Sequence, residues 1–243
     1  DHYNSQALSV LPRVPLPARN NASIFDAVGP VGPRCKLGMT AYGTGDEQKR
    51  LCREPTRRQR SVLFSIGSND QWGFELAALE SGDFDAVHAF DCTLPGPPKK
   101  IPPSITQRVH FHAVCLGATS SVVNGRRYAS YLELYTMSGE RQPPAACKID
   151  AEGWEWHVLP RITGGPQWLR PQQIAFELHV LTFAPAKRIA PGDFWRVKTP
   201  GEVAALLSLL FGHGYLLISR HDNPACLHCS ELVVARVCED TAW

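Results

Sequence analysis

Residues 62–79 read VLFSIGSNDQWGFELAAL, and this stretch decides the fold. Its first five residues are apolar apart from Ser65 and are followed by Gly67, a pattern typical of a short strand buried on both faces. The apolar side chains of 72–79 then predict a helix. The turn between them lacks the G-x-G-x-x-G pattern of dinucleotide-binding proteins. A strand, a glycine turn and a helix in this order favour an open α/β sheet.

The same alternation of strands and helices continues along the chain. Six further apolar runs have the length of strands: 86–90, 109–116, 146–149, 174–178, 215–219 and 231–237. A helix is expected over 202–211, where apolar residues recur at helical spacing between Pro200 and Gly212. We therefore predict an α/β fold with a Rossmann-like, doubly wound sheet. The sheet should be mostly parallel, with an antiparallel C-terminal strand pair.

The amino-acid composition of the chain changes near residue 61. Residues 1–33 are rich in Pro, Asn and Ala, with one short helix expected around 24–28. Residues 34–60 combine glycines with a polar, arginine-rich stretch, which predicts a poor core and a cap or lid. We expect an N-terminal extension and cap at 1–60, followed by one ligand-binding domain at 61–243.

The charge balance argues against a nucleic-acid partner. The chain has 25 Lys and Arg against 23 Asp and Glu, a net charge of +2, whereas nucleic-acid-binding domains carry a strong basic excess. No apolar run reaches the roughly 18 residues that a membrane-spanning helix needs. We therefore expect no membrane contact by this segment. Because the chain starts at Asp1, we expect a processed form, and an upstream signal or anchor would lie outside it.

Eight cysteines are many for a cytosolic enzyme of this size. Disulfides in an oxidising compartment, free thiols and a zinc site are three open explanations. Cys226 and Cys229 form a CxxC, but it lacks a second ligand pair at the usual zinc spacing. Three cysteines lie at or near the ends of apolar runs, which favours buried thiols: Cys92, Cys115 and Cys147. Together with an N-glycosylation sequon at Asn21, the cysteines favour the secretory pathway.

Two residues that follow predicted strands indicate an adenosine-type ligand. Ligands of open α/β sheets bind beyond the carboxyl ends of the strands. Gly67 allows a tight turn and a close approach of the backbone to a ligand. Asp91, 24 residues later, follows the second strand and can accept hydrogen bonds from ribose hydroxyls. Because no phosphate cradle is evident, a cofactor without phosphates, such as S-adenosylmethionine, fits better than NAD.

The most specific motif is KIDAEGWE at 148–155, in which Asp150, Glu152 and Gly153 follow a strand. Glu177 and His179 lie on one face of the next strand because side chains alternate. The predicted catalytic set is Asp150, Glu152, Glu177 and His179, with His179 or Asp150 as a general base. The same cluster could instead hold a divalent metal, with Asp150, Glu177 and His179 as the predicted ligands.

At this point a family resemblance is evident. The chain resembles FkbM-like and methyltransferase-like (METTL-type) proteins at three motifs: FSIGSNDQWGFE at 64–75, KIDAEG at 148–153 and ELH at 177–179. The glycine-rich segment before Cys52 resembles that of the secretory members. The resemblance implies a class I methyltransferase fold, with domain 61–243 binding S-adenosylmethionine. The cofactor-binding residues that we expect are Gly67, Ser68, Asn69, Phe74, Glu75, Asp91, Cys92 and Leu116. Two features depart from the family pattern. Residues 45–48 read GDEQ where Asp-Gly-Gly is expected, and the proline-rich loop after Asp91 is longer than usual.

The resemblance favours an O-methyltransferase acting on a sugar or glycan hydroxyl in the secretory pathway, most simply in the Golgi lumen. A methyltransferase for a small metabolite or peptide, and a cytoplasmic location, are the nearest alternatives. A glycosyltransferase is the alternative from another reaction class, because Asp83-Phe84-Asp85 is a DxD sequence. Since this DxD precedes a strand instead of following one, a surface turn is the simpler interpretation. A non-catalytic binding module that keeps the fold is the last alternative.

Overall fold

The structure is a computed structural model of the 243-residue chain. It describes residues 24–28, 31–32, 35–53, 60–94, 96–180, 198–222, 226 and 229–236. The sequon at Asn21 and the last cysteine, Cys238, lie outside the described residues.

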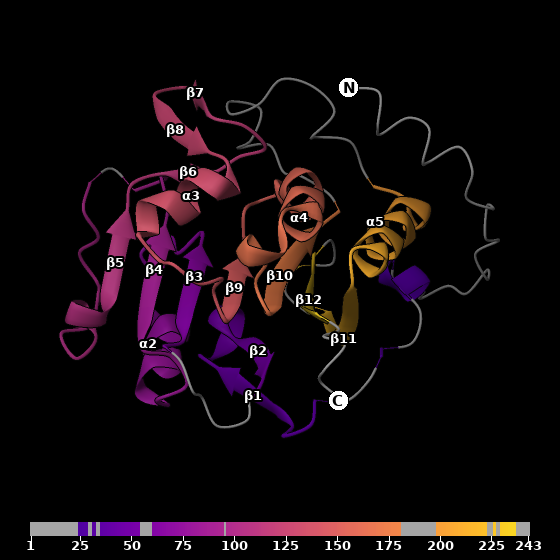
Figure 1. Ribbon diagram of the computed structural model, residues 1–243, viewed down its shortest axis with the longest axis horizontal. Helices are drawn as coiled ribbons and strands as arrows, with labels where there is room; N and C mark the ends of the chain where they lie inside the picture. The colour runs from indigo at the N-terminus through magenta and orange to yellow at the C-terminus, as the bar shows by residue number, and fades with distance from the viewer. Residues whose placement is uncertain are drawn as a thin grey trace.

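A seven-stranded sheet forms the centre of the molecule, and its strands run across Figure 1 in the order β5-β4-β3-β9-β10-β12-β11. The strands are β5 (Val109–His112), β4 (Ala86–Phe90), β3 (Val62–Ile66), β9 (Ala146–Ile149), β10 (Gln173–His179), β12 (Cys229–Arg236) and β11 (Tyr215–Asp222). The pairings from β5 to β10 are parallel, and β12 is antiparallel to both of its neighbours. The predicted doubly wound sheet with an antiparallel C-terminal pair is confirmed.

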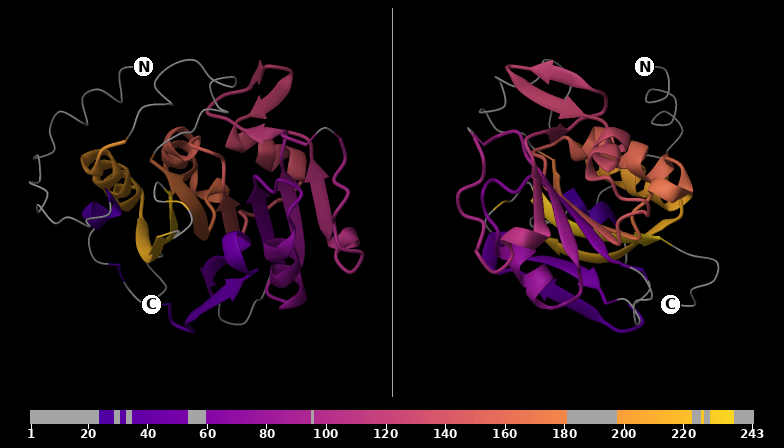
Figure 2. Two further views of the ribbon diagram at one scale, coloured as in Figure 1. Left: turned by 180° about the vertical axis from the view of Figure 1, so that it is seen from behind. Right: turned by 60° about the vertical axis from the view of Figure 1, so that its left-hand side comes forward.

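One face of the sheet is covered by three helices, α3 (Tyr131–Ser138), α4 (Glu155–Gly164) and α5 (Pro200–Gly212), and by the short 3-10 helix η1 (Ile24–Val28). These elements lie together on one side of the sheet in Figure 2. Large side chains of the strands, such as Phe64, Phe90 and Phe176, pack against the helices and are fully buried. α5 begins with a capping box of Thr199 and Glu202, which explains the sharp start of the predicted helix.

The other face is covered by α2 (Gly73–Glu80) and a hairpin of β1 (Met39–Tyr42) and β2 (Lys49–Cys52), which a 3-10 turn, η2 (Gly45–Glu47), connects. The small strand residues Ala89, Ala146 and Ala175 lie on this face, so the hairpin can approach the sheet closely. The expectation of a poor core for 34–60 is wrong. Tyr42 and Leu51 are buried in this face of the core.

The predicted strand over 109–116 is also wrong in its second half. β5 ends at His112, and the chain turns at Val114, whose amide donates to the carbonyl of His112. The residues that follow form a separate small sheet of β6 (Cys115–Leu116), β7 (Ser121–Val123) and β8 (Arg126–Ala129). This sheet, α3 and α4 are absent from the predicted elements, because none of them has a long apolar repeat. Two further 3-10 turns are η3 (Thr106–Arg108) and η4 (Gln167–Leu169).

Three disulfides join cysteines of the described chain: Cys35–Cys52, Cys92–Cys115 and Cys226–Cys229. The buried-thiol interpretation is therefore wrong for Cys92 and Cys115. It is confirmed for Cys147, which is free and fully buried in the sheet. Among the described residues, no helix has both the length and the apolar character to cross a membrane.

A stack of histidines joins β4 to the edge strand β5. The rings of His110 and His112 lie 4.8 and 5.4 Å from that of His88, which is only 4% exposed. Nδ1 of His88 lies 3.1 Å from Nε2 of His112, and its Nε2 lies 3.1 Å from a carboxylate oxygen of Glu140. Burial lowers the pKa of His88 to about 4, although Glu140 opposes the shift. Burial also lowers the pKa of His112.

This stack predicts a stability that decreases in acid. The unfolded chain takes up a proton at His88 near pH 6.5, whereas the folded chain resists protonation down to about pH 4. The contribution of His88 is therefore fully present above pH 6.5 and is lost as the pH falls from 6.5 toward 4. Urea unfolding across this range should show a falling free energy of unfolding, with a smaller fall in His88→Gln. The exposed His221→Gln is the control and should keep the wild-type slope. An unchanged slope in His88→Gln would contradict this account.

Candidate functional site

The carboxyl ends of the central strands bring the predicted site residues to one edge of the sheet. The chain order reverses between β3 and β9, and such a switch point is where open α/β sheets bind ligands. Gly67 follows β3 and Asp150 follows β9 at this point. A Cβ atom on Gly67 would lie 1.8 Å from the backbone oxygen of Asp150, and its φ is +80°. Glycine is therefore required here, because the two strand ends touch.

Backbone strain is concentrated in the two loops that leave this point. Four described residues other than glycine have a positive φ, and three of them lie here: Asn69 and Asp70 after β3, and Glu152 after β9. The fourth, Asn124, lies in the turn of the small sheet. Left-handed conformations cost free energy in residues with a Cβ atom and often occur at functional sites. The strain therefore supports the sequence-based choice of these two loops.

Asp91 follows β4 and holds the loop after β3. One of its oxygens, Oδ2, accepts from the amide of Asn69 at 2.7 Å and faces the hydroxyl of Ser68 at 3.5 Å. The other, Oδ1, accepts from the amide and hydroxyl of Thr93 at 2.7 and 2.6 Å. Asp91 is only 2% exposed. Its carboxylate thus positions the turn that the sequence assigns to the cofactor. Four hydrogen bonds use its acceptor positions, and the one from the Ser68 hydroxyl is the longest.

Two other predicted cofactor residues lie beneath this turn rather than on it. Phe74 and Glu75 start α2 and are 2% and 1% exposed. The hydroxyl of Ser65 donates to Glu75, whose Oε2 has no hydrogen-bond partner among the described residues. Burial raises the pKa of Glu75, against the charge of the nearby Lys148. Lys148 itself donates to the carbonyl of Gly67, so charged side chains support the turn from below.

The last two predicted cofactor residues lie beside the end of β4. Cys92 is bonded to Cys115 and therefore offers no free thiol. Leu116 follows in β6 and is buried. The disulfide ties the loop after β4 to the start of the small sheet, which keeps β6 close to the edge where Asp91 lies.

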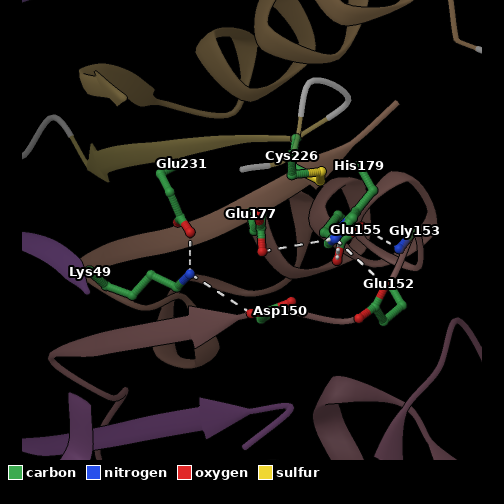
Figure 3. Close-up of a disulfide and its surroundings, with 10 residues drawn as sticks. Lys49, Asp150, Glu152, Gly153, Glu155, Glu177, His179, Cys226 and Glu231 are labelled. Carbon is green, nitrogen blue, oxygen red and sulfur yellow. Dashed lines mark hydrogen bonds and ion pairs between the residues drawn. A yellow bond between two sulfur atoms is a disulfide. The ribbon is translucent and has the colours of Figure 1, made fainter. Parts of the chain in front are cut away.

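The predicted catalytic residues meet at the ends of β9 and β10. Phe176 pairs with Ile149, so the next residues along the two strands, Glu177 and Asp150, lie side by side. Nε2 of His179 lies 3.9 Å from Glu177 Oε2 and 3.7 Å from Glu152 Oε2. Figure 3 shows the imidazole among these carboxylates. His179 is 8% exposed, whereas the side chain of Glu152 is 86% exposed and faces the outside.

Glu155, which was not among the predicted site residues, holds this arrangement together. It is fully buried and accepts from the amides of Ala151 and Gly153 at 2.7 and 2.8 Å. Its Oε1 also lies 3.5 Å from Nδ1 of His179. Burial lowers the pKa of His179, but the carboxylates of Glu155, Asp150 and Glu177 outweigh it and raise the pKa to about 10. The imidazole is therefore protonated at neutral pH in this arrangement.

Lys49 is the second residue that the sequence analysis missed. It lies in β2, is 2% exposed, and donates to Glu231 of β12, while its Nζ lies 3.8 Å from Asp150 Oδ2 (Figure 3). Burial lowers the pKa of Lys49, but the negative charges of Glu231 and Asp150 outweigh the effect of burial, so the pKa is raised. Burial raises the pKa of Glu231 to about 7 against the charge of Lys49. Nothing in the sequence around Lys49 distinguishes it from a surface lysine, because its partners are far away in the chain.

The CxxC and the DxD both have structural explanations here. Cys226 and Cys229 form a disulfide, and their sulfur atoms lie within 4.8 Å of a carboxylate oxygen of Glu177. In the DxD, Asp83 accepts from the Tyr42 hydroxyl and Asp85 from the Ser61 amide, both at 2.7 Å. These aspartates precede β4 and lie at the opposite edge of the sheet from Asp150. The interpretation as a turn holds, and the DxD cannot serve this site.

Comparisons with known proteins give likenesses of structure only. No protein-family model matches the chain, and no curated protein matches it. Among solved structures, a Methanococcus jannaschii fibrillarin pre-rRNA processing protein is 10% identical to this chain, with a TM-score of 0.46. The match covers 73% of this chain and 66% of the fibrillarin chain, just under two thirds of the latter. A Burkholderia thailandensis 1,6-didemethyltoxoflavin-N1-methyltransferase is 17% identical, with a TM-score of 0.43 over 74% and 72%.

A Streptococcus thermophilus rRNA methylase is 11% identical, with a TM-score of 0.42 over 74% of this chain and 88% of that one.

The strand order, rather than these distant likenesses, defines the fold. Seven strands with the switch point at β3 and β9, and with only β12 reversed, form the Rossmann-like methyltransferase fold. The predicted fold class is confirmed.

The contact between Gly67 and Asp150 can be tested with two matched glycines. Gly82 has nearly the same φ, +75°, but a Cβ atom there would meet nothing within 4 Å. Gly82→Ala should therefore cost only backbone strain, about 1 to 2 kcal/mol of the free energy of unfolding. Gly67→Ala adds the collision with Asp150 and should cost at least about 2 kcal/mol more. Urea unfolding measures both, and equal losses would show that the two strand ends do not touch.

Proposed function

We propose that this protein is an S-adenosylmethionine-dependent O-methyltransferase. The observation that carries the proposal is the convergence of Gly67, Asp91 and Asp150 at the carboxyl ends of three adjacent strands of a methyltransferase-type sheet. The motifs at 64–75, 148–153 and 177–179 support it, because they resemble those of FkbM-like methyltransferases. The carboxylate cluster beside the switch point supports transfer to a hydroxyl group, which must lose a proton.

The residues at the strand ends fit S-adenosylmethionine by their chemistry. Asp91 is an acceptor at the end of the second strand, where ribose hydroxyls bind in such sheets. A ribose hydroxyl would replace the hydroxyl of Ser68, whose contact with Oδ2 is long at 3.5 Å. The turn from Gly67 to Asn69 lacks the glycines that bind phosphates in dinucleotide sites. Leu116 and the Cys92–Cys115 disulfide supply apolar atoms beside Asp91. These residues would hold the adenosine, and Gly67 would let it approach the sheet.

When bound, S-adenosylmethionine supplies an electrophilic methyl group on a positively charged sulfur. The task of the chain is to align an acceptor hydroxyl with that methyl and to remove the hydroxyl proton. Asp150 is the best placed base, because it lies next to Gly67 and its side chain is 26% exposed. As the acceptor oxygen gains the methyl, its O–H bond breaks and the proton passes to the Asp150 carboxylate. S-adenosylmethionine would supply the methyl group and keep the electron pair of the carbon–sulfur bond, so the transfer would need no further reactant.

His179 has a different role in this proposal from the one first considered. Its raised pKa of about 10 means that it already carries a proton at neutral pH, so it is a poor base in this arrangement. The imidazolium instead balances Glu152, Glu155 and Glu177 and keeps their side chains together. Lys49 does the same for Asp150 and Glu231 from the hairpin side.

We propose a sugar or glycan hydroxyl as the acceptor. The family resemblance supports this class, since FkbM-like proteins often methylate hydroxyls, including those of sugars. An aromatic pair beside the site also supports it: the ring of Trp154, which follows the Asp150 loop, lies 5.0 Å from that of Tyr128 in β8. Trp154 is half-buried and can offer an apolar face to a sugar ring. A small metabolite or a peptide remains the alternative acceptor.

Three disulfides support a location in the secretory pathway, most simply the Golgi lumen, because disulfides persist in oxidising compartments. The cytosol is the alternative location. Two of these bonds lie at the proposed site, Cys92–Cys115 beside Asp91 and Cys226–Cys229 beside Glu177. Their formation and the geometry of the site are therefore coupled.

Cofactor binding is the first test. Calorimetry should show that the protein binds S-adenosylmethionine but no nucleotide sugar, and that Asp91→Asn binds it about tenfold more weakly. Asp83→Asn is the control, because Asp83 lies before β4 and Asp91 after it. Binding of a nucleotide sugar without binding of S-adenosylmethionine would overturn the proposal.

Turnover is the second test, in a methyl-transfer assay across a panel of glycans with mass spectrometry of the products. Asp150→Asn should keep cofactor affinity and lose at least about a hundredfold in rate, the usual contribution of a general base. His179→Ala should also lose turnover, because it removes the charge that holds the carboxylates together. If both variants kept rates within about threefold, under ~0.7 kcal/mol of barrier, the assigned cluster would be wrong.

A further inference from the structure

The environment of His179 has a feature that methyl transfer alone does not explain. The residue is more than nine-tenths buried, yet its Nδ1 has no hydrogen-bond partner among the described residues. Its ion-pair partner at Nδ1 is Glu155, whose Oε1 lies 3.5 Å away. On the other side of the ring, Nε2 faces Glu152 and Glu177 at 3.7 and 3.9 Å, as Figure 3 shows. These separations are longer than hydrogen bonds, so Nε2 faces carboxylates without bonding to them.

The charges around this ring are also unequal. Among the described residues, the ion pairs of the cluster join five carboxylates to two basic side chains, Lys49 and His179. The carboxylates are Asp150, Glu152, Glu155, Glu177 and Glu231. Four of them have side chains that are 26% exposed or less. Negative charge held away from water is costly unless a cation compensates it.

We propose that Asp150, Glu152 and His179 bind one divalent cation of the Mn²⁺ or Mg²⁺ class. One ligand atom from each residue can be chosen so that all three lie within 4.8 Å of one another. Ligand atoms around an ion at about 2.1 Å are about 3 Å apart when adjacent and about 4.2 Å apart when opposite. The three ligand atoms would need to move only slightly closer together to bind one ion. The exposed side chain of Glu152 can make this movement. Oxygen ligands with a single imidazole favour Mn²⁺ or Mg²⁺ over Zn²⁺.

The surrounding residues suit such a site. A histidine that binds a metal usually donates its other N–H to a carboxylate, and Glu155 is that carboxylate for His179. Glu155 is anchored by the amides of Ala151 and Gly153, so it can orient the ring. Lys49 approaches Asp150 at Oδ2, which leaves Oδ1 for the ion. In the metal-bound form Nε2 carries no proton and gives its lone pair to the ion.

The ligand set also differs from the one expected from sequence. Glu177 was predicted as a ligand, but its carboxylate groups with the sulfur atoms of Cys226 and Cys229 instead. We assign Glu152 in its place. This residue has a positive φ, and its Oε2 lies 3.7 Å from Nε2 of His179. The role of the ion, unlike its binding, rests on the proposed function. It would hold the acceptor oxygen beside Asp150 and lower the pKa of the hydroxyl.

Binding of Mn²⁺ itself tests the site without any activity assay. The full chain is treated with a chelator, dialysed and titrated with Mn²⁺, and the free ion is followed by electron paramagnetic resonance. We expect one saturable site, weakened at least about tenfold in Asp150→Asn, Glu152→Gln and His179→Asn. Glu155→Gln, which leaves the three ligands intact, should weaken binding about 10- to 100-fold. Glu80→Gln, at the exposed end of α2, is the matched control and should bind as the wild type does.

Glu152→Gln is the decisive variant, because its side chain is exposed and the substitution should not disturb folding. Circular dichroism confirms that each variant is folded. Absence of saturable binding at millimolar Mn²⁺, or unchanged affinity in Glu152→Gln, would overturn the site. Titration of S-adenosylmethionine into the same chelated protein separates this proposal from the previous one. Cofactor binding without Mn²⁺ binding refutes only the metal site, and Mn²⁺ binding without cofactor binding refutes only the proposed cofactor.

Discussion

The rest of the structure depends on the contact between Gly67 and the backbone of Asp150. The parallel strands β3 and β9 end side by side at this point. Their backbones are so close that a side chain at residue 67 would collide with the backbone oxygen of Asp150. One loop turns toward Asp91 and the other toward His179. The turn after β3 and the carboxylate cluster are therefore adjacent, because the backbones touch. A methyl donor on one loop and an acceptor on the other would meet across this contact.

Compensation of buried charge is the second constraint. A sheet face with Asp150, Glu177 and Glu231 so close together would be unstable without cations. Lys49 supplies one charge from the hairpin, whose Tyr42 and Leu51 are buried against the same face of the sheet. The imidazolium of His179 supplies another. A divalent ion at His179 would continue the same principle, with the metal in place of a proton.

The two faces of the sheet differ in the side chains that they carry. The face under α3, α4 and α5 contains large apolar side chains and supplies most of the core. The opposite face has small residues in the strand centres and polar residues toward the carboxyl ends. Disulfides tie the loops of this edge, at Cys92–Cys115 and Cys226–Cys229, to neighbouring elements. Strained residues such as Asn69 and Glu152 can persist there because the surrounding contacts hold them.

The sequence by itself determined the strands β3, β4, β9 and β10 and the edge at which the site lies, because buried strands and the residues after them are local patterns. Its choice of Asp150, Glu152, Glu177 and His179 brought together residues that do meet. Only the tertiary structure decided which cysteines pair, that the strand at 109 ends at His112, and that Lys49 and Glu155 complete the cluster. The physical reason is distance along the chain. Lys49 meets Glu231 across 182 positions, and no local pattern records such a partner.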